Sequence, residues 1–200
     1  MKKLDSELLT VVGAAGELFS VRKELYTELE PDTILDDFMQ TLRIAKQGFK
    51  VVYEPKAYAM ETASVSVKEE LKRKIRICAG GWQSMLRLKS LLNPFPNPIL
   101  TFQYISHRAL RWSLAPIFLP IIFISSLLLI EQPIYCFIFA AQCLFYSMAL
   151  LGWYLANKEI KVKLLFIPYY FFIMNYAVFM GFGRYIKGNQ SAAWERAQRA

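Results

Sequence analysis

The chain contains only one histidine and three cysteines among its 200 residues. Cys78, Cys136 and Cys143 lack the spacing of metal ligands, and two of them lie in apolar runs. We therefore expect reduced thiols that pack as small hydrophobic side chains. His107 alone cannot form a histidine-rich metal site, and we expect it to be a polar residue at the membrane interface. A P-loop and a GxGxxG motif are also missing, which excludes the common nucleotide-binding loops.

Charge is scarce in the second half of the sequence. Only five charged residues lie in residues 113–183, whereas residues 1–112, here called the polar half, are rich in both signs. No apolar run follows Lys2 and Lys3, so the start is not typical of a secretory signal and we expect the polar half in the cytoplasm.

Long apolar runs are what the sequence has instead. Hydrophobic residues make up 55% of the chain, which is high for a soluble protein of this size. Three charge-free runs, at residues 113–130, 134–155 and 164–182, are each close to the roughly 20 residues with which a helix crosses a bilayer. We predict an integral protein of the inner or plasma membrane, with an all-α transmembrane region of about three helices.

The net charge of +8 suggests that the protein binds an anionic partner. No nucleic-acid-binding motif accompanies the basic residues, so nucleic acid is not an expected partner. The cations lie beside the apolar runs, which favours contact with the head groups of membrane lipids or with a sugar diphosphate.

The positions of the cations conflict with three crossings. His107, Arg108 and Arg111 precede the first run, and a lysine-rich loop separates the second run from the third. The positive-inside rule puts both in the cytosol, and three crossings then leave the basic tail outside. Either one apolar segment lies in the interface or re-enters, or the tail is an exception. The tail carries Arg184, Lys187, Arg196 and Arg199.

The polar half predicts alternating strands and helices. Residues 11–21 favour a strand or a loop in which backbone approaches something closely, and residues 49–53 favour a strand. Residues 33–47 and the basic residues 67–88 are typical of helices. This order predicts part of an α/β sandwich. The stretch before Val67 is too short for a complete nucleotide-binding domain, so we expect a further part upstream.

Four regions follow from these patterns. Residues 1–89 are expected to form the partial α/β domain, residues 90–112 an interfacial segment, residues 113–183 the transmembrane helices and residues 184–200 a basic tail. In the interfacial segment we expect four aromatic side chains at head-group depth. These are Phe95, Phe102, Tyr104 and Trp112.

Five short motifs resemble, in order and spacing, the second half of family 2 glycosyltransferases related to cellulose, hyaluronan and poly-N-acetylglucosamine synthases. The resemblance implies a GT-A-like α/β domain ahead of the membrane helices. It also implies an inverting hexosyltransferase that moves a sugar from a nucleotide-sugar donor to a glycan or lipid-linked acceptor. The motifs are GAAG at 13–16, ILDDF at 34–38, QGFKV at 47–51, RKIRI at 73–77 and GGWQ at 80–83.

The resemblance implies roles for six residues. Asp37, with Asp36 beside it, corresponds to the catalytic base, and Arg76 with Arg73 corresponds to the cations that bind the diphosphate. Arg73 and Ile77 stand where the family has glutamine and tryptophan, so only Arg76 matches cleanly. Trp82 and Gln83 are the further candidates for substrate binding.

The resemblance also implies a divalent cation, Mg²⁺ or Mn²⁺, whose ligands belong to the first half of the family's domain and are not in this chain. We accordingly predict that the polypeptide alone transfers no sugar, and that a missing N-terminal half or another synthase subunit is a partner. We further predict that Asp37 lies at a helix N-terminus, on the same face of the fold as Arg76.

Structural explanations compete for these residues. The two aspartates also suit the positive end of a helix dipole, and the basic helix suits a solvated or lipid-facing surface. A non-catalytic membrane anchor or partner subunit derived from such an enzyme is therefore the alternative. A small transporter is disfavoured, because the apolar runs carry no charge that would mark a pathway.

Overall fold

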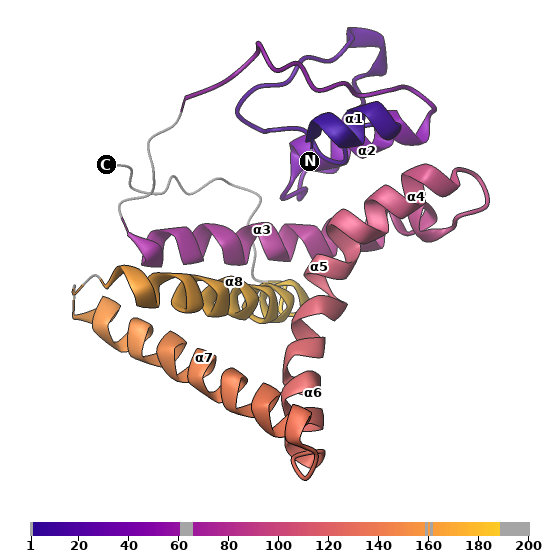
Figure 1. Cartoon of the computed structure of the whole chain (residues 1–200). Coiled ribbons are helices and arrows are strands. Elements are labelled where there is room, and N and C mark those ends of the chain that lie inside the picture. Colours follow the sequence, from indigo (N-terminus) through magenta and orange to yellow (C-terminus); the bar gives the residue numbers. More distant parts are fainter. Residues whose placement is uncertain (1, 61–65, 159, 161, 189–200) are drawn as a thin grey trace.

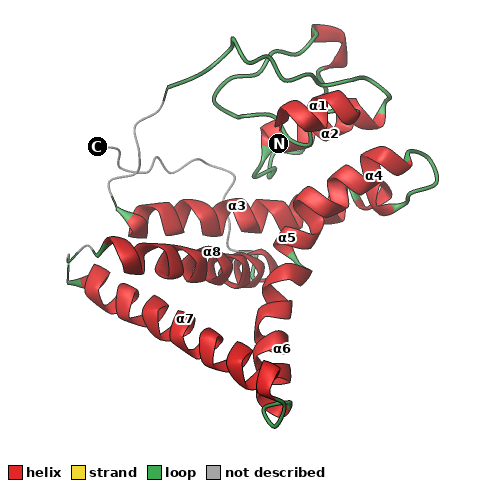
Figure 2. Cartoon of the chain, viewed as in Figure 1, coloured by secondary structure: helices red, strands yellow, loops and turns green. Residues whose placement is uncertain are grey.

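The computed structural model describes residues 2–60, 66–158, 160 and 162–188, and in these residues it contains helices and irregular segments only (Figure 2). The structure is 69% helical with no strand among the described residues. The predicted α/β domain is therefore wrong for the part of the chain that the structure describes.

The reason lies in how residues 10–12 and 51–53 meet. Val11 N donates to Val51 O at 3.0 Å, but the other three hydrogen bonds here involve side chains. Val51 N donates to Thr10 Oγ1 at 2.9 Å, and Tyr53 N donates to Ser6 Oγ at 3.2 Å. A sheet needs a continuous ladder of backbone hydrogen bonds. The two apolar stretches share only one backbone–backbone hydrogen bond.

The order of the helices along the chain is α1 (Lys2–Leu8), η1 (Lys23–Leu25), α2 (Asp36–Lys46), α3 (Val67–Arg87), η2 (Lys89–Leu92), α4 (Pro98–Tyr104), η3 (Ile105–Ala109), α5 (Leu110–Trp112), α6 (Leu114–Leu128), α7 (Pro133–Asn157) and α8 (Lys163–Ile186). Three apolar helices, α6, α7 and α8, form a triangle on one side of the remaining helices (Figure 1). Residues 2–60 are called the N-terminal segment below.

Helix α2 forms where the sequence predicts a helix. It begins at Asp36 and ends at Lys46, and Gly48 just beyond it has φ +90°, the left-handed conformation that glycine adopts without strain. Phe38, Leu42 and Ala45 lie on one face and are buried. This face anchors the N-terminal segment to the rest of the protein.

Helix α3 is the central helix, and its three faces have three different partners. Its N-cap is Ser66, whose side chain accepts from Glu69 N at 3.2 Å. A Cβ added at Gly80 would lie 2.6 Å from Leu35, and one added at Gly81 would lie 2.5 Å from Trp112. The two glycines therefore do not break the helix but allow Ile34 and Leu35, just before α2, and Trp112 of α5 to pack closely on it. The third face meets α8.

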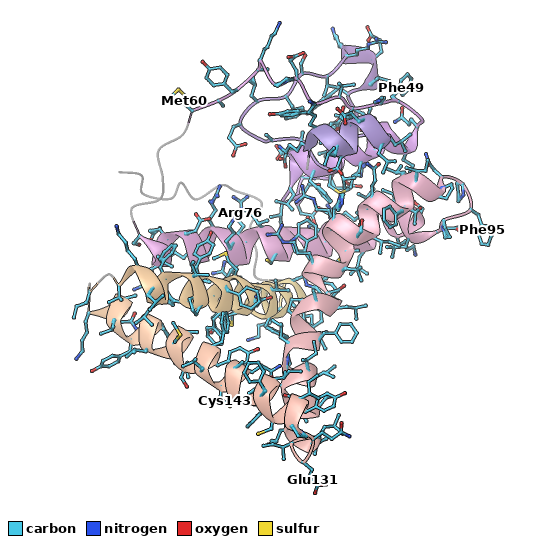
Figure 3. The ribbon with its side chains drawn as sticks, in the orientation of Figure 1. Phe49, Met60, Arg76, Phe95, Glu131 and Cys143 are labelled. Carbon is cyan, nitrogen blue, oxygen red and sulfur yellow. The ribbon has the colours of Figure 1, made fainter. Side chains whose placement is uncertain are left out.

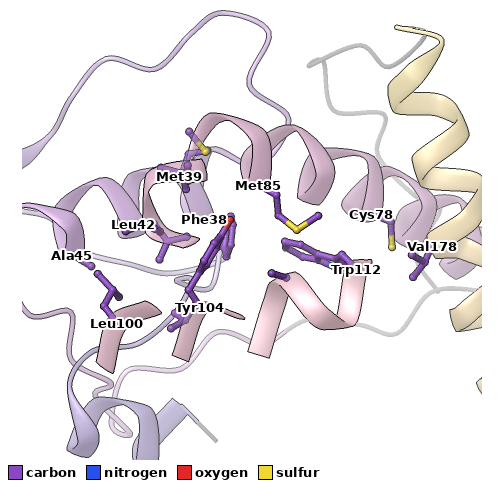
Figure 4. Close-up of a cluster of buried hydrophobic side chains, with 14 residues drawn as sticks. Phe38, Met39, Leu42, Ala45, Cys78, Met85, Leu100, Tyr104, Trp112 and Val178 are labelled. Carbon is purple, nitrogen blue, oxygen red and sulfur yellow. The ribbon is translucent and has the colours of Figure 1, made fainter. Parts of the chain in front are cut away.

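The main core joins α2, α3, α4 and α5 (Figure 4). The Phe38 ring lies edge-on to Trp112 at 5.3 Å between centroids and 6.5 Å from Tyr104. Tyr104 and Trp112 are only 0% and 5% exposed, so their rings pack inside the protein and do not face lipid. Phe95 and Phe102 are exposed and still suit the predicted place at head-group depth.

Two helices of the described residues, α7 and α8, are long and apolar enough to cross a membrane. Helix α6 covers 15 residues of the first predicted span, residues 113–130. It is bent by 57° from Pro98–Trp112, so a third span exists only if this bent pair is counted as one. The length and apolar composition that a membrane span requires are therefore confirmed for α7 and α8. The predicted interfacial segment, residues 90–112, is folded into η2, α4, η3 and α5.

Candidate functional site

The carboxylate of Asp37 lies under a glycine-containing loop. Asp37 occupies the first turn of α2, which confirms the predicted position at a helix N-terminus. A Cβ added at Gly16 would lie 3.2 Å from Asp37 Oδ2, so glycine at this position lets the backbone approach the carboxylate. The close approach predicted for this stretch is therefore present, in a loop rather than a strand.

The loop is held on α2 by two further contacts. Ala14 N donates to Thr41 Oγ1 at 3.1 Å. Gly13 has φ +93°, and a Cβ there would lie 2.7 Å from a carbon of the Phe38 ring. A larger residue at position 13 would be strained in backbone and would displace the ring. The loop and the start of α2 thus form one small site around Asp37.

The site is electrostatically tuned around Asp37. Burial raises the pKa of the Asp37 carboxyl above its ordinary value, and the negative charges of Asp36 and Glu17 act in the same direction. A backbone hydrogen bond from Phe38 and the positive charge of Arg108 oppose this rise in pKa. A carboxylate with a raised pKa is a better proton acceptor than an ordinary surface aspartate.

Replacing Asp37 by asparagine is expected to raise the unfolding temperature at pH 7, because the folded protein then no longer holds a half-buried carboxylate. A carboxyl whose pKa is raised by folding is penalised only above its unfolded pKa, near 3.8. The gain should therefore shrink as the pH falls towards that value. Thermal unfolding in detergent at pH 7 and at pH 4 measures it.

Asp32 provides a matched control, because folding lowers the pKa of its carboxyl and raises that of Asp37. Both oxygens of Asp32 accept from Arg87 Nη2 at 2.7 Å, and this hydrogen bond lowers the pKa of Asp32. Its stabilising contribution is present above the unfolded pKa and is lost as the pH falls. The variant Asp32→Asn should therefore unfold at a lower temperature at pH 7. A lower unfolding temperature for Asp37→Asn as well would contradict the assigned electrostatics.

Arg108 belongs to the site although the sequence places it only among the cations before the first apolar run. Its Nε and Nη2 donate to Val12 O at 3.2 and 3.0 Å. The guanidinium lies 5.5 Å from the Phe38 ring centre and 5.8 Å from that of Trp112. Arg108 lies in the π-helical turn η3, a local irregularity often found at functional sites. No pattern in the sequence marks such a turn.

Arg76 lies on the face of α3 that is turned to the start of α2. It precedes Gly80 by one helical turn, and Gly80 packs against Ile34 and Leu35. Figure 3 shows Arg76 on the side of α3 towards the N-terminal segment. The arginine is buried, at 9% exposure. That Arg76 and Asp37 act together stays a prediction.

The other four predicted residues are engaged in contacts within the protein. Gln83 Oε1 accepts from Ile34 N at 3.0 Å, and Gln83 Nε2 donates to Asp32 O at 2.9 Å. Trp82 lies against Phe182 of α8, with 4.6 Å between ring centroids, so it does not face Asp37. Arg73 pairs with Glu70. Asp36 is exposed, and its Oδ1 accepts from Asp37 N at 2.9 Å.

The resemblance assigns the ligands of its divalent cation to residues outside this chain. Among the described residues, no group of three or more His, Cys, Asp or Glu side chains could hold a metal ion. The half-buried Asp37 carboxylate, with its raised pKa, can accept a proton.

Comparison with protein-family models, with curated proteins and with solved structures found no match to this chain. Any function must therefore be argued from the residues themselves.

Proposed function

We propose that the chain is the membrane-embedded, acceptor-side part of an inverting glycosyltransferase, in which Asp37 is the general base. The observation that carries this proposal is the half-buried Asp37 carboxylate beneath the Gly13–Gly16 loop, where burial raises its pKa. The order of the five motifs supports the same reading. Its partners are a nucleotide-sugar donor, a glycan or lipid-linked acceptor and membrane lipids.

The proposed chemistry needs a proton acceptor beside the acceptor sugar. The acceptor hydroxyl oxygen forms a bond to the anomeric carbon, while the bond from that carbon to the diphosphate oxygen breaks and its electron pair leaves with the nucleotide. The hydroxyl proton passes to Asp37. Positive charge near the leaving diphosphate stabilises it, and Arg76 is the residue proposed for this role.

The test is turnover in the presence of a donor-binding half. The chain in detergent, given nucleotide-sugar donors, Mg²⁺ or Mn²⁺ and primer glycans, should release no nucleotide diphosphate. Co-expression with a separate chain that carries the donor-binding half should restore release, and Asp37→Asn should then reduce it by about 10²–10⁴-fold. Asp36→Asn is the matched control and should keep most of the activity, because Asp36 is exposed.

Two results would count against the proposal. Diphosphate release by the chain alone, abolished by Asp37→Asn, would show that the donor half is not needed. Restored activity that Asp37→Asn leaves unchanged, in a variant with normal thermal unfolding, would remove Asp37 from the reaction.

The second candidate function is a non-catalytic membrane anchor or partner subunit. The observation in its favour is that Gln83, Trp82 and Arg73 make contacts within the protein, as residues of a structural unit do. An anchor would co-purify with a catalytic chain, and Asp37→Asn would change neither the co-purification nor the activity of that complex.

A further inference from the structure

The charges of α3 keep this helix outside the hydrocarbon of a membrane. Its first ten residues include both signs of charge at close spacing, and burying them in lipid costs several kcal/mol. Three hydrogen bonds also tie α3 to the N-terminal segment: Gln83 and Arg87 donate to Asp32, and Gln83 accepts from Ile34 N. Helix α3 and the N-terminal segment therefore lie on one side of the membrane. The charged residues are Lys68, Glu69, Glu70, Lys72, Arg73, Lys74 and Arg76.

The C-terminal end of α8 packs closely against α3. A Cβ added at Gly181 would lie 2.5 Å from Cys78 Cβ and 2.9 Å from Ile75 O, so the two backbones touch. One residue further, Phe182 contacts Trp82. Figure 1 shows α8 beside α3, and this is the most extensive helix pair of the described residues. The last turns of α8 thus lie on the same side of the membrane as α3.

The start of α6 lies on that side too. Trp112, the last residue of α5, packs against Phe38 in the core, and α6 begins two residues later at Leu114. Both ends of the apolar region, Leu114 and the end of α8, are therefore on the side of the N-terminal segment. A chain that leaves and returns to one side crosses an even number of times, which excludes the three crossings predicted from the sequence.

Helices α6 and α7 form an antiparallel pair. Ser126 Oγ donates to Gln142 Oε1 at 2.7 Å, and Phe123 lies 5.1 Å from Phe139 between ring centroids. The turn between these helices holds Glu131 and no cation, whereas the α7–α8 link holds Lys158, Lys161 and Lys163. The positive-inside rule puts that link with the N-terminal segment. Figure 3 shows Glu131 at the tip far from this segment.

We propose that the chain crosses the membrane as one α6–α7 hairpin and that α8 lies along the lipid surface beside α3. Only the turn at Glu131 reaches the opposite side, while the N-terminal segment, the α7–α8 link and the end of α8 share one side. This arrangement removes the conflict between the basic tail and the positive-inside rule.

The surface of α8 suits the boundary between head groups and acyl chains. Its exposed side chains include Leu164, Ile167 and Phe179, and cations stand at its ends, at Lys163, Arg184 and Lys187. Lipid covers these exposed apolar side chains, and anionic head groups pair with the cations at the two ends of α8. Between α6, α7 and α8 lies a cavity of about 510 Å³ lined almost wholly by apolar side chains, which acyl chains rather than water would fill.

Single cysteines test the arrangement. Cys136 and Cys143 are changed to serine, while Cys78 stays, because it is buried and burial raises the pKa of its thiol to about 11, which keeps it unreactive. Glu131→Cys, Lys158→Cys and Lys187→Cys are made in this background, with Lys46→Cys in α2 as the reference. A membrane-impermeant maleimide is applied to sealed right-side-out and inside-out vesicles, and thermal unfolding checks each fold.

The expected result is that positions 46, 158 and 187 are labelled in the same vesicles and position 131 only in the opposite ones. Labelling of position 187 opposite to 46 would restore three crossings and overturn the proposal. Labelling of position 158 opposite to 46 would mean that α7 and α8 are the crossing pair. Labelling of 131 with 46, or in neither vesicle type, would show that the hairpin does not cross. The background protein, which holds only Cys78, should stay unlabelled.

Discussion

Replacing Trp112 by alanine should lower the free energy of unfolding by about 3–5 kcal/mol, the usual cost of removing a buried tryptophan. Trp112 is 5% exposed, lies edge-on to Phe38 and covers Gly81 of α3. Its loss leaves a cavity at the point where α2, α3 and α5 meet, and it removes one of the two rings beside Arg108. Denaturant or thermal unfolding in detergent measures the loss.

Trp153 offers a matched control in the same protein. It lies on α7 and is 49% exposed, so Trp153→Ala should change the free energy of unfolding by about 0.5 kcal/mol or less. Equal losses for the two variants would mean that the core around Trp112 does not hold the fold together. Should Trp112→Ala fail to fold, Trp112→Phe keeps a ring and should show a smaller loss in the same direction.

Replacing Gly181 by alanine should separate α8 from α3. The new methyl group would lie 2.5 Å from Cys78 Cβ and 2.9 Å from Ala79 N and Ile75 O. Two of these atoms are backbone and cannot rotate away, so the helices must move apart. We expect a loss of about 1–3 kcal/mol, as for other overpacked interfaces, measured by thermal unfolding in detergent.

Gly183 is the control for this substitution, since it lies two residues further along α8 and a Cβ there would have nothing within 4 Å. Alanine favours a helix over glycine by up to about 1 kcal/mol, so Gly183→Ala should be neutral or stabilising. If Gly181→Ala behaved like Gly183→Ala, the close contact between α8 and α3 would be wrong. The inferred membrane arrangement would then lose its main support.

Helices of the polar half could be predicted because their signals are local. The aspartates before Phe38 and the glycine at 48 mark the two ends of α2, and Ser66 caps α3. The expected strands fail for a non-local reason. A strand is stabilised by its neighbours, and residues 10–12 and 51–53 share one backbone hydrogen bond. An apolar run alone does not say whether neighbouring strands exist.

Half of the candidate site could be predicted in the same way. Asp37 and the Gly13–Gly16 loop follow from their motifs, and the structure brings them together. Arg108 and the bonding of Gln83 could not, because both depend on contacts between residues far apart in the sequence. The contact between Trp82 and Phe182 could not be predicted either, because the two residues lie about a hundred positions apart in the sequence. The role of Trp82 in substrate binding stays a prediction.

The pairing of α8 with α3 also sets an order of events during synthesis. Cys78 and Val178 share a buried cluster although they are about a hundred residues apart, a separation that makes a contact slow to form. Until α8 has been made, the strip of α3 around Ile75 and Cys78 has no cover from it. The bilayer or a chaperone must shield this strip in the meantime. The packing of α8 on α3 is thus the last step of assembly. A substitution that disturbs α8 would therefore also destabilise α3, which is synthesised much earlier.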